Sequence, residues 1–170
     1  MVRLKSRYVL FEVLYPQTSP SSADSSREDI VLRGHRPSPA DITGKVLLQE
    51  IRRSLQLHLG DYGSGKVCSL LQLKYWSNNT STGILRCHRE DVDLLLTGLF
   101  FLRELGNDNL RVIVNPVKVS GTIKKVEQYA MRRSDRMVAL VRKGSARAAT
   151  DDALQLSNNN FASVTADAQD

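Results

Sequence analysis

The sequence has few of the residues that stabilise secreted and membrane proteins. Its two cysteines, Cys68 and Cys87, are too few to build a disulfide framework. The longest apolar run, LLLTGLFFL at 94–102, is far shorter than the ~20 residues of a bilayer-spanning helix. The opening MVRLKSRYVLFEVLYPQ has no small-residue cleavage site after its apolar stretch, so no signal peptide is expected. These features predict a nuclear or cytoplasmic protein with reduced thiols and no membrane segment.

Positive charge is concentrated in one part of the chain. The formal net charge of the whole sequence is +6. Residues 111–143 contain nine Lys or Arg and only two acids, Glu127 and Asp135, whereas one Arg and four Asp follow from Gly144 onward. A basic surface of this kind suggests a polyanionic partner, most often nucleic acid. Charge alone does not distinguish RNA from DNA, or either from anionic lipid.

The first part of the chain predicts a strand, a loop and a helix. RYVLFEVLY at 7–15 is rich in β-branched and aromatic residues and ends before a proline, as a buried strand does. Residues 17–36 are rich in serine without periodicity, so a loop is expected. Ser38 and Pro39 predict a helix start, with Ser38 as N-cap. An apolar stripe then continues to Gly60, where the helix should end.

The remaining patterns complete an α+β fold. The runs at 69–77 and 82–90 predict a β-hairpin, followed by a helix from Asp91 to Gly106 and a strand at 111–120. Residues 121–143 then predict a basic helix. The order indicates an RRM-like or ferredoxin-like βαββαβ sandwich with an additional C-terminal basic helix. We expect one RNA-binding domain over 1–143, with the serine-rich loop at 17–36, and a polar tail without stable structure at 144–170.

Two short motifs resemble catalytic or nucleotide-binding sites. GDYGSGK at 60–66 matches most of a P-loop, but Val67 replaces the metal-binding Ser or Thr, and the segment leaves a helix rather than a strand. We therefore expect an exposed glycine loop there, in which Lys66 could touch phosphate. HREDVD at 88–93 could supply metal ligands to a nuclease. Acids that cap a helix and complement its dipole explain it better.

The scarcity of aromatic residues limits how RNA could be read. Single-strand-reading RRM domains stack bases on aromatics of an RNP1 segment, but the corresponding TGILRCHRE has none. Tyr8, Tyr75 and Trp76 could stack, although core or hairpin packing is an equal alternative. Recognition of phosphates and of folded RNA shape is the better hypothesis.

The second helix has more apolar residues than one face can bury. Leu94, Phe100 and Phe101 should point partly away from the sheet. Burial under the last helix and contact with a protein partner are equally compatible with this surplus.

Four stretches together resemble one family. They are MVRLKSRYVLFEV, LLQEIRRSLQLHLGDYG, LKYWSNNTSTGILRCHRE and NPVKVSGTIKKVEQYAMRR, and they are similar to the Pop-five subunits of eukaryotic ribonuclease P and ribonuclease MRP, especially fungal ones. The similarity covers most of 1–15 and 38–137.

The resemblance implies a non-catalytic protein that stabilises the catalytic RNA. Such particles remove 5′ leaders from precursor tRNA and cleave precursor rRNA, in the nucleus and nucleolus. It implies no cofactor bound by the protein, no metal site in it, and magnesium held by the partner RNA. Implied partners are ribonuclease P RNA, ribonuclease MRP RNA, precursor tRNA, a small RRM-like subunit called Pop-eight, and the Rpp-one and Pop-one subunits.

From the residues themselves we expect an RNA-binding set and a protein interface. The first comprises basic residues from several segments: Arg3, Lys5, Lys74, Arg86, Arg89, Lys118, Lys124, Lys125, Arg132 and Arg133. The second is the apolar surplus Leu94, Phe100 and Phe101. Two alternatives remain open, a free-standing module for single-stranded RNA and a metal-dependent nuclease that depends on His88 or Asp91.

Overall fold

The computed structural model describes residues 5–16, 34–106 and 110–142. Two compact units divide after Met131. Most of the expected serine-rich loop and the whole tail at 144–170 lie outside the described residues, as does Arg3.

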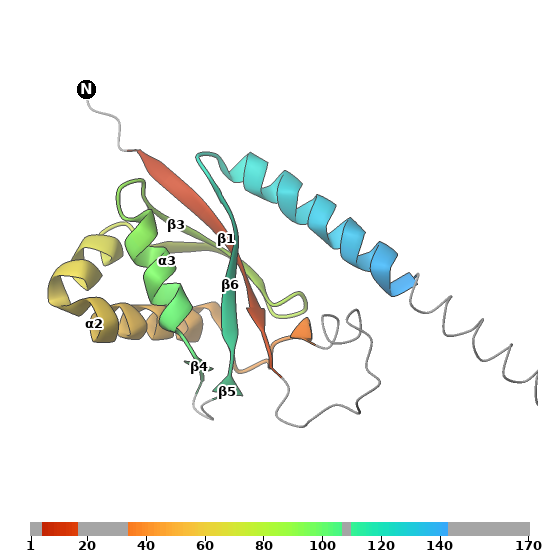
Figure 1. The fold of residues 1–170 in the computed structure, drawn as a ribbon, viewed down its shortest axis with the longest axis horizontal. Helices are drawn as coiled ribbons and strands as arrows, with labels where there is room; N and C mark the ends of the chain where they lie inside the picture. Colours follow the sequence, from red (N-terminus) through yellow and green to blue (C-terminus); the bar gives the residue numbers. More distant parts are fainter. Residues whose placement is uncertain (1–4, 17–33, 107–109, 143–170) are drawn as a thin grey trace, which may run out of the picture. The chain divides into compact units, whose positions relative to one another are not determined.

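A four-stranded antiparallel sheet organises the first unit. Strands β1 (Ser6–Leu14), β2 (Gln72–Ser77), β3 (Thr82–His88) and β6 (Ile113–Ser120) have the spatial order β2-β3-β1-β6. Helices α2 (Gly44–Cys68) and α3 (Val92–Phe101) lie beside each other against this sheet (Figure 1). This is the split βαβ arrangement, and it confirms the predicted ferredoxin-like fold.

The main core lies between the sheet and the two helices. The odd-numbered residues of β1, from Val9 to Val13, are fully buried in it. Leu47, Ile51 and Leu55 of α2 follow the i, i+4 spacing that the sequence indicated, and all three are inaccessible to solvent. The odd-numbered residues of β1 and the i, i+4 stripe of α2 therefore pack together in a single apolar layer.

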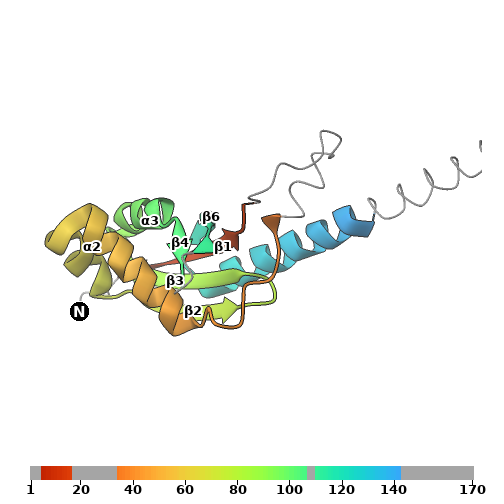
Figure 2. The same cartoon turned by 90° about the horizontal axis from the view of Figure 1, so that it is seen from below.

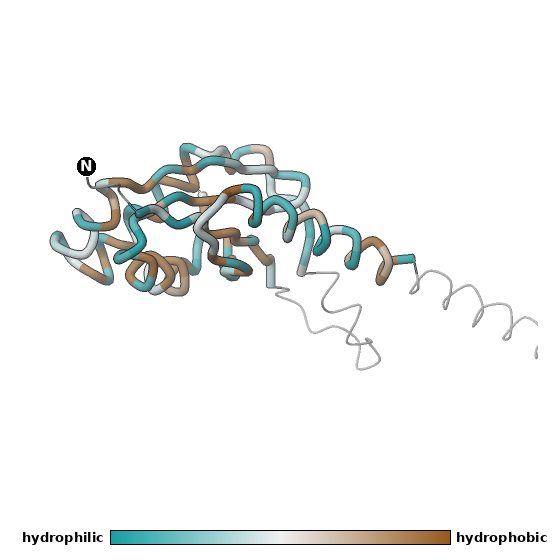
Figure 3. Tube along the Cα trace, turned by 90° about the horizontal axis from the view of Figure 1, so that it is seen from above, coloured by the Kyte–Doolittle hydropathy of each residue, from teal (hydrophilic) through white to brown (hydrophobic). Residues whose placement is uncertain are grey.

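A smaller core covers the opposite face of the sheet. Leu10 and Ile84 point away from α2 and α3 and pack against Val126, which is fully buried. Val126 belongs to the C-terminal helix, residues 123–142, along which hydrophobic and hydrophilic residues alternate (Figure 3). Residues 123–131 of this helix belong to the first unit, so β1 is buried on both faces.

The prediction that α2 begins at Ser38 was wrong. The helix starts at Gly44, and the Thr43 hydroxyl accepts the capping bond from the Val46 backbone N–H. Ser38 is instead buried, where its hydroxyl accepts a hydrogen bond of 2.6 Å from Tyr15 and donates one of 2.9 Å to Ser81. The hydroxyl of Ser38 therefore serves tertiary hydrogen bonds to Tyr15 and Ser81 rather than capping a helix.

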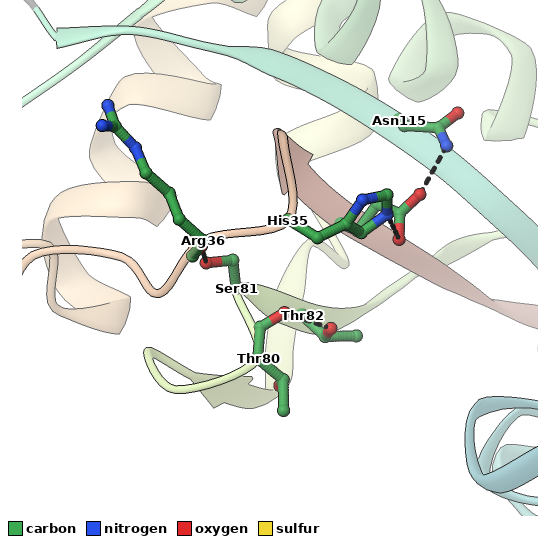
Figure 4. A network of polar contacts seen from close by, with 7 residues as sticks. His35, Arg36, Thr80, Ser81, Thr82 and Asn115 are labelled. Carbon is green, nitrogen blue, oxygen red and sulfur yellow. Dashed lines mark hydrogen bonds and ion pairs between the residues drawn. The ribbon is translucent and has the colours of Figure 1, made fainter. Parts of the chain in front are cut away.

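The same polar network ties residues 34–36 to the sheet (Figure 4). Ser81 donates to the Arg36 carbonyl at 2.7 Å. His35 Nε2 lies 3.4 Å from the Glu12 carboxylate, which also accepts a 2.7 Å hydrogen bond from the Asn115 amide. These contacts satisfy a carboxylate that is buried on β1.

The predicted helix end at Gly60 is a kink instead. Gly60 has φ 64°, a value that favours glycine, and helical structure resumes after it as far as Cys68 (Figure 2). The expectation of a glycine loop at 60–66 was therefore wrong. Gly63 and Ser64 are buried in the continuing helix.

The second predicted helix is also shorter than expected. It ends at Phe101 rather than at Gly106, and β4 (Glu104–Leu105) pairs with β5 (Leu110–Arg111) in a separate two-stranded sheet. Leu105 of β4 and Val112, which follows β5, are buried in the main core. Within the described residues, none of the helices is long and apolar enough to cross a membrane.

Close packing at Gly83 gives a test of this core. A Cβ at Gly83 would overlap the buried ring of Phe11 and lie 3.1 Å from Trp76 Cε3. Gly83→Ala should lower the free energy of unfolding by about 1 to 3 kcal/mol. Gly65→Ala is the control, because no heavy atom lies within 4 Å of its Cβ position. Urea unfolding would measure both, and equal stabilities would contradict the packing described.

Candidate nucleic-acid interface

One end of the sheet gathers basic residues from distant parts of the sequence. The strand register places Ser6 beside His88 and Tyr8 beside Ser120, so the start of β1 and the ends of β3 and β6 coincide. The Arg89 N–H donates a 2.9 Å hydrogen bond to the Lys5 carbonyl. Both side chains are exposed, and they form the first part of the basic surface.

The start of the C-terminal helix adds the second part. Lys124 and Lys125 are exposed just beyond Ser120. Lys118 Nζ lies 5.5 Å from the centre of the Tyr129 ring, a cation–π contact that holds the ammonium over the outer face of the sheet. Packing of Val126 against Leu10 and Ile84 positions this start of the helix on the sheet.

Arg7 is a basic residue that the sequence interpretation missed. The sequence pattern places it within the buried strand at 7–15 and gives it no separate role. Its guanidinium Nη1 lies 3.4 Å from the Cβ position of Gly121, at the junction between β6 and the C-terminal helix. Arg7 therefore lies at the junction that leads into the helix carrying Lys124 and Lys125, and only the register of β1 against β6 reveals this.

Lys74 and Arg86 lie on the strands farther from this junction. Lys74 is exposed on the edge strand β2, and Arg86 is partly buried on β3 beside Tyr8. Arg132 and Arg133 lie in the second unit, where Arg132 is exposed and Arg133 is half-buried. Arg136 follows Arg132 by four residues on the same side of that helical segment, so it is a further exposed cation that helical spacing could have identified.

The predicted apolar surplus divides into a buried and an exposed part. Leu94 packs against the main core, whereas the exposed fractions of Phe100 and Phe101 are 63% and 42%. Burial of these rings under the last helix was the other expectation, and their exposure contradicts it. The C-terminal helix contacts the opposite face of the sheet.

Phe101 also forms the wall of an open groove. Its ring stacks on His58 with centroids 4.6 Å apart, and Phe100 meets it edge-on at 5.4 Å. The groove has a volume of about 310 Å³, and Leu57, exposed at 77%, lies beside it. Arg103 lies 5.4 Å from the Phe100 ring. We call Leu57, His58, Phe100 and Phe101 the aromatic patch.

Sequence comparison decides the family. The profile of the Rpp14/Pop5 family matches residues 7–131, which is more than half of the chain. The chain belongs to the Rpp14/Pop5 family. The matched residues span the whole sheet, both of the helices that cover it, and the first turns of the C-terminal helix.

Individual Rpp14/Pop5 relatives cover nearly the full length. The "Ribonuclease P/MRP protein subunit POP5" of Saccharomyces cerevisiae is 56% identical over 163 residues, covering 95% of this chain and 89% of the relative. The protein of the same name from Schizosaccharomyces pombe is 44% identical over 79% of this chain and 88% of its own. "Ribonuclease P protein component 2" of Pyrococcus horikoshii is 31% identical over 75% and 83%.

In this Rpp14/Pop5 chain, the HREDVD segment does not form a metal cluster. Among the described residues, no group of three or more His, Cys, Asp or Glu side chains could hold a metal ion. Asp91 is 2% exposed and pairs with Lys66 at 3.6 Å, whereas Glu90 and Asp93 are exposed. Burial, followed by the negative charge of Asp91, raises the pKa of the Cys87 thiol to about 11. The thiol is therefore protonated at neutral pH and is a poor metal ligand.

The expected capping role of Asp91 was only partly correct. Asp91 occupies the N-cap position of α3, but its side chain makes no capping hydrogen bond. Asp93 lies in the first turn, where its charge complements the helix dipole.

Asp91→Asn should therefore act through stability. The change keeps the shape and removes the charge that Lys66 pairs with, so we expect a loss of about 1 to 3 kcal/mol in the free energy of unfolding. Asp93→Asn, at an exposed position of the same helix, is the matched control and should cost under about 1 kcal/mol. Thermal unfolding measures both, and an unchanged Asp91→Asn protein would show that the ion pair contributes no stability.

Proposed function

We propose that this protein is a non-catalytic, RNA-binding subunit of ribonuclease P and ribonuclease MRP. The 56% identity to the yeast subunit, over nearly all of both chains, is the observation that carries this proposal. The particles would remove 5′ leaders from precursor tRNA and cleave precursor rRNA, in the nucleus and nucleolus. Ribonuclease P RNA and ribonuclease MRP RNA would be the nucleic-acid partners.

The basic surface supports an RNA-stabilising role. Lys5, Arg7 and Arg89 at one end of the sheet adjoin Lys124 and Lys125 at the start of the helix. Cations that are distributed over several elements neutralise phosphates of neighbouring RNA segments, which otherwise repel each other. Magnesium ions held by the RNA, rather than by this protein, would then perform the cleavage chemistry.

Lys124 and Lys125 provide a test of phosphate binding. Replacing both with Ala should weaken binding similarly for RNAs of different sequence. The slope of the logarithm of affinity against the logarithm of salt concentration should decrease by roughly 1 per lost contact. Lys45→Ala, at an exposed lysine of α2, is the control. An unchanged salt slope for the double variant would refute the assignment.

The aromatic patch is the proposed contact for a protein subunit. Exposed Phe pairs beside a groove are typical of protein interfaces, in which aromatic side chains are enriched. The small RRM-like Pop-eight subunit and the Rpp-one and Pop-one subunits are the candidate partners. The assignment is to this class of partner.

Changing Phe100 and Phe101 to Ser should detach a partner subunit from the reconstituted particle. The isolated protein should remain folded, because both rings are substantially exposed. Leu99→Ser is the contrasting variant, since Leu99 is fully buried and its loss should prevent folding. Co-purification and circular dichroism separate these effects. Unfolding of the Phe double variant would place its rings in the core instead.

The full chain alone should not cleave precursor tRNA in the presence of magnesium. Protein-based cleavage needs converging metal ligands or a general base beside a nucleophile. Depletion of the protein from the assembled particle should nevertheless impair cleavage of precursor tRNA. Cleavage by the protein alone that disappears in Asp91→Asn would favour the metal-dependent nuclease.

A further inference from the structure

A β-bulge in β2 exposes two adjacent side chains together. Leu73 and Trp76 both face the helix-covered side, since Leu73 lies against Gly44 and Trp76 stacks on Phe11. Residues three apart in a regular strand point to opposite faces. The register against β3 shifts between Leu73 and Tyr75, which resolves this conflict and leaves Lys74 as the extra residue. Lys74 and Tyr75 are consequently both exposed, with Tyr75 at 50%.

Arg86 lies next to this pair on the outer face of the sheet. It stands opposite Gln72 on β2 and opposite Tyr8 on β1, and Tyr75 stands opposite Ile84, two residues before Arg86. Arg86 Nε is shielded from solvent and has no hydrogen-bond partner within the part of the chain that the structure describes. A buried donor without an acceptor is unfavourable, so a ligand that draws the guanidinium outward and pairs with it would be favoured.

The side chains around Arg86 suit a ligand that has both an anionic group and an aromatic ring. Lys74, Arg86 and Arg89 supply positive charge on or beside the two strands. Glu12, the acid on the same face of β1, is engaged by His35 and Asn115 near the opposite end of the strand. A guanidinium forms two parallel hydrogen bonds to a phosphate, and an exposed tyrosine provides a surface for a base.

We propose that Tyr75, Arg86 and Lys74 bind one unpaired nucleotide of RNA, with its base stacked on Tyr75 and its phosphate paired with Arg86 and Lys74. The inference rests on the proposed RNA-binding function and adds recognition of an unpaired nucleotide to phosphate binding. The stacking residue comes from the bulged edge strand β2, outside the TGILRCHRE segment, which has no aromatic residue. A base held there belongs to a single strand or a bulge, because the bases of a duplex already stack on each other.

The full chain can be tested with two labelled probes, a single-stranded decauridylate and a blunt ten-base-pair RNA duplex. Tyr75→Ala should weaken decauridylate binding by about 5- to 150-fold, since stacking of one base contributes about 1 to 3 kcal/mol. Tyr75→Phe should retain binding, because it retains the ring. Arg86→Lys should bind the single strand more weakly than the wild type, because lysine lacks the planar fork. Tyr62→Ala, at a tyrosine of α2 that is 80% exposed, is the matched control.

Binding of the duplex should be unchanged in Tyr75→Ala, and fluorescence anisotropy measures both probes. Equal losses for the two probes, or no loss for either, would overturn the nucleotide site. Unchanged decauridylate binding with weaker capture of a protein subunit would also overturn it and assign this face to a protein. The two proposals can also fail separately. If depletion of the protein leaves precursor tRNA cleavage intact but decauridylate binding still depends on Tyr75, the proposed role as a ribonuclease P subunit is refuted and the nucleotide site stands.

Discussion

The structure depends on the burial of β1 on both faces. Val9, Phe11 and Val13 contact the layer of α2 and α3, whereas Leu10 packs with Ile84 and Val126 on the other side. A central strand with two apolar faces needs a packing partner on each side. Helices α2 and α3 cover one face, and the start of the C-terminal helix covers the other. This packing fixes the direction in which the helix leaves β6. It therefore also sets where Lys124 and Lys125 are presented.

The start of the C-terminal helix divides the outer face of the sheet into a covered part and an exposed part. Around Leu10 and Ile84 the helix excludes solvent, so those positions are unavailable to a ligand. Tyr75 and Lys74 on the edge strand remain exposed. The edge strand and the end of the sheet therefore remain accessible, whereas its centre is covered by the helix. Lys5, Arg89, Lys124, Lys125 and the bulged edge strand all lie in exposed parts of the molecule.

The buried polar groups hold the loops at one end of the sheet. Tyr15, Ser38 and Ser81 exchange hydroxyl hydrogen bonds, and burial raises the pKa of Tyr15, so the phenol remains a donor at neutral pH. Each of these groups would cost stability without its partners. The aromatic patch, by contrast, contains rings that contact solvent and each other. The polar network is thus internal to the fold, whereas the aromatic patch is exposed.

The sequence by itself determined the order of the four main strands and the two helices packed against them, the α+β class and the basic character of the last helix. The β-branched and aromatic residues at 7–15 indicate a buried strand, and the i, i+4 spacing at 47–55 identifies the buried face of α2, because both patterns follow local geometry. Only the tertiary structure decided that α2 starts at Gly44 and continues past Gly60, that β2 contains a bulge, and that Arg7 lies beside Gly121. Each of these features depends on a partner distant in sequence: Tyr15 and Ser81 draw Ser38 into the interior, and the cores hold Leu73, Trp76 and Val126. Local propensity contains no information about such partners, so the basic residues were identifiable from sequence, whereas their grouping into surfaces was not.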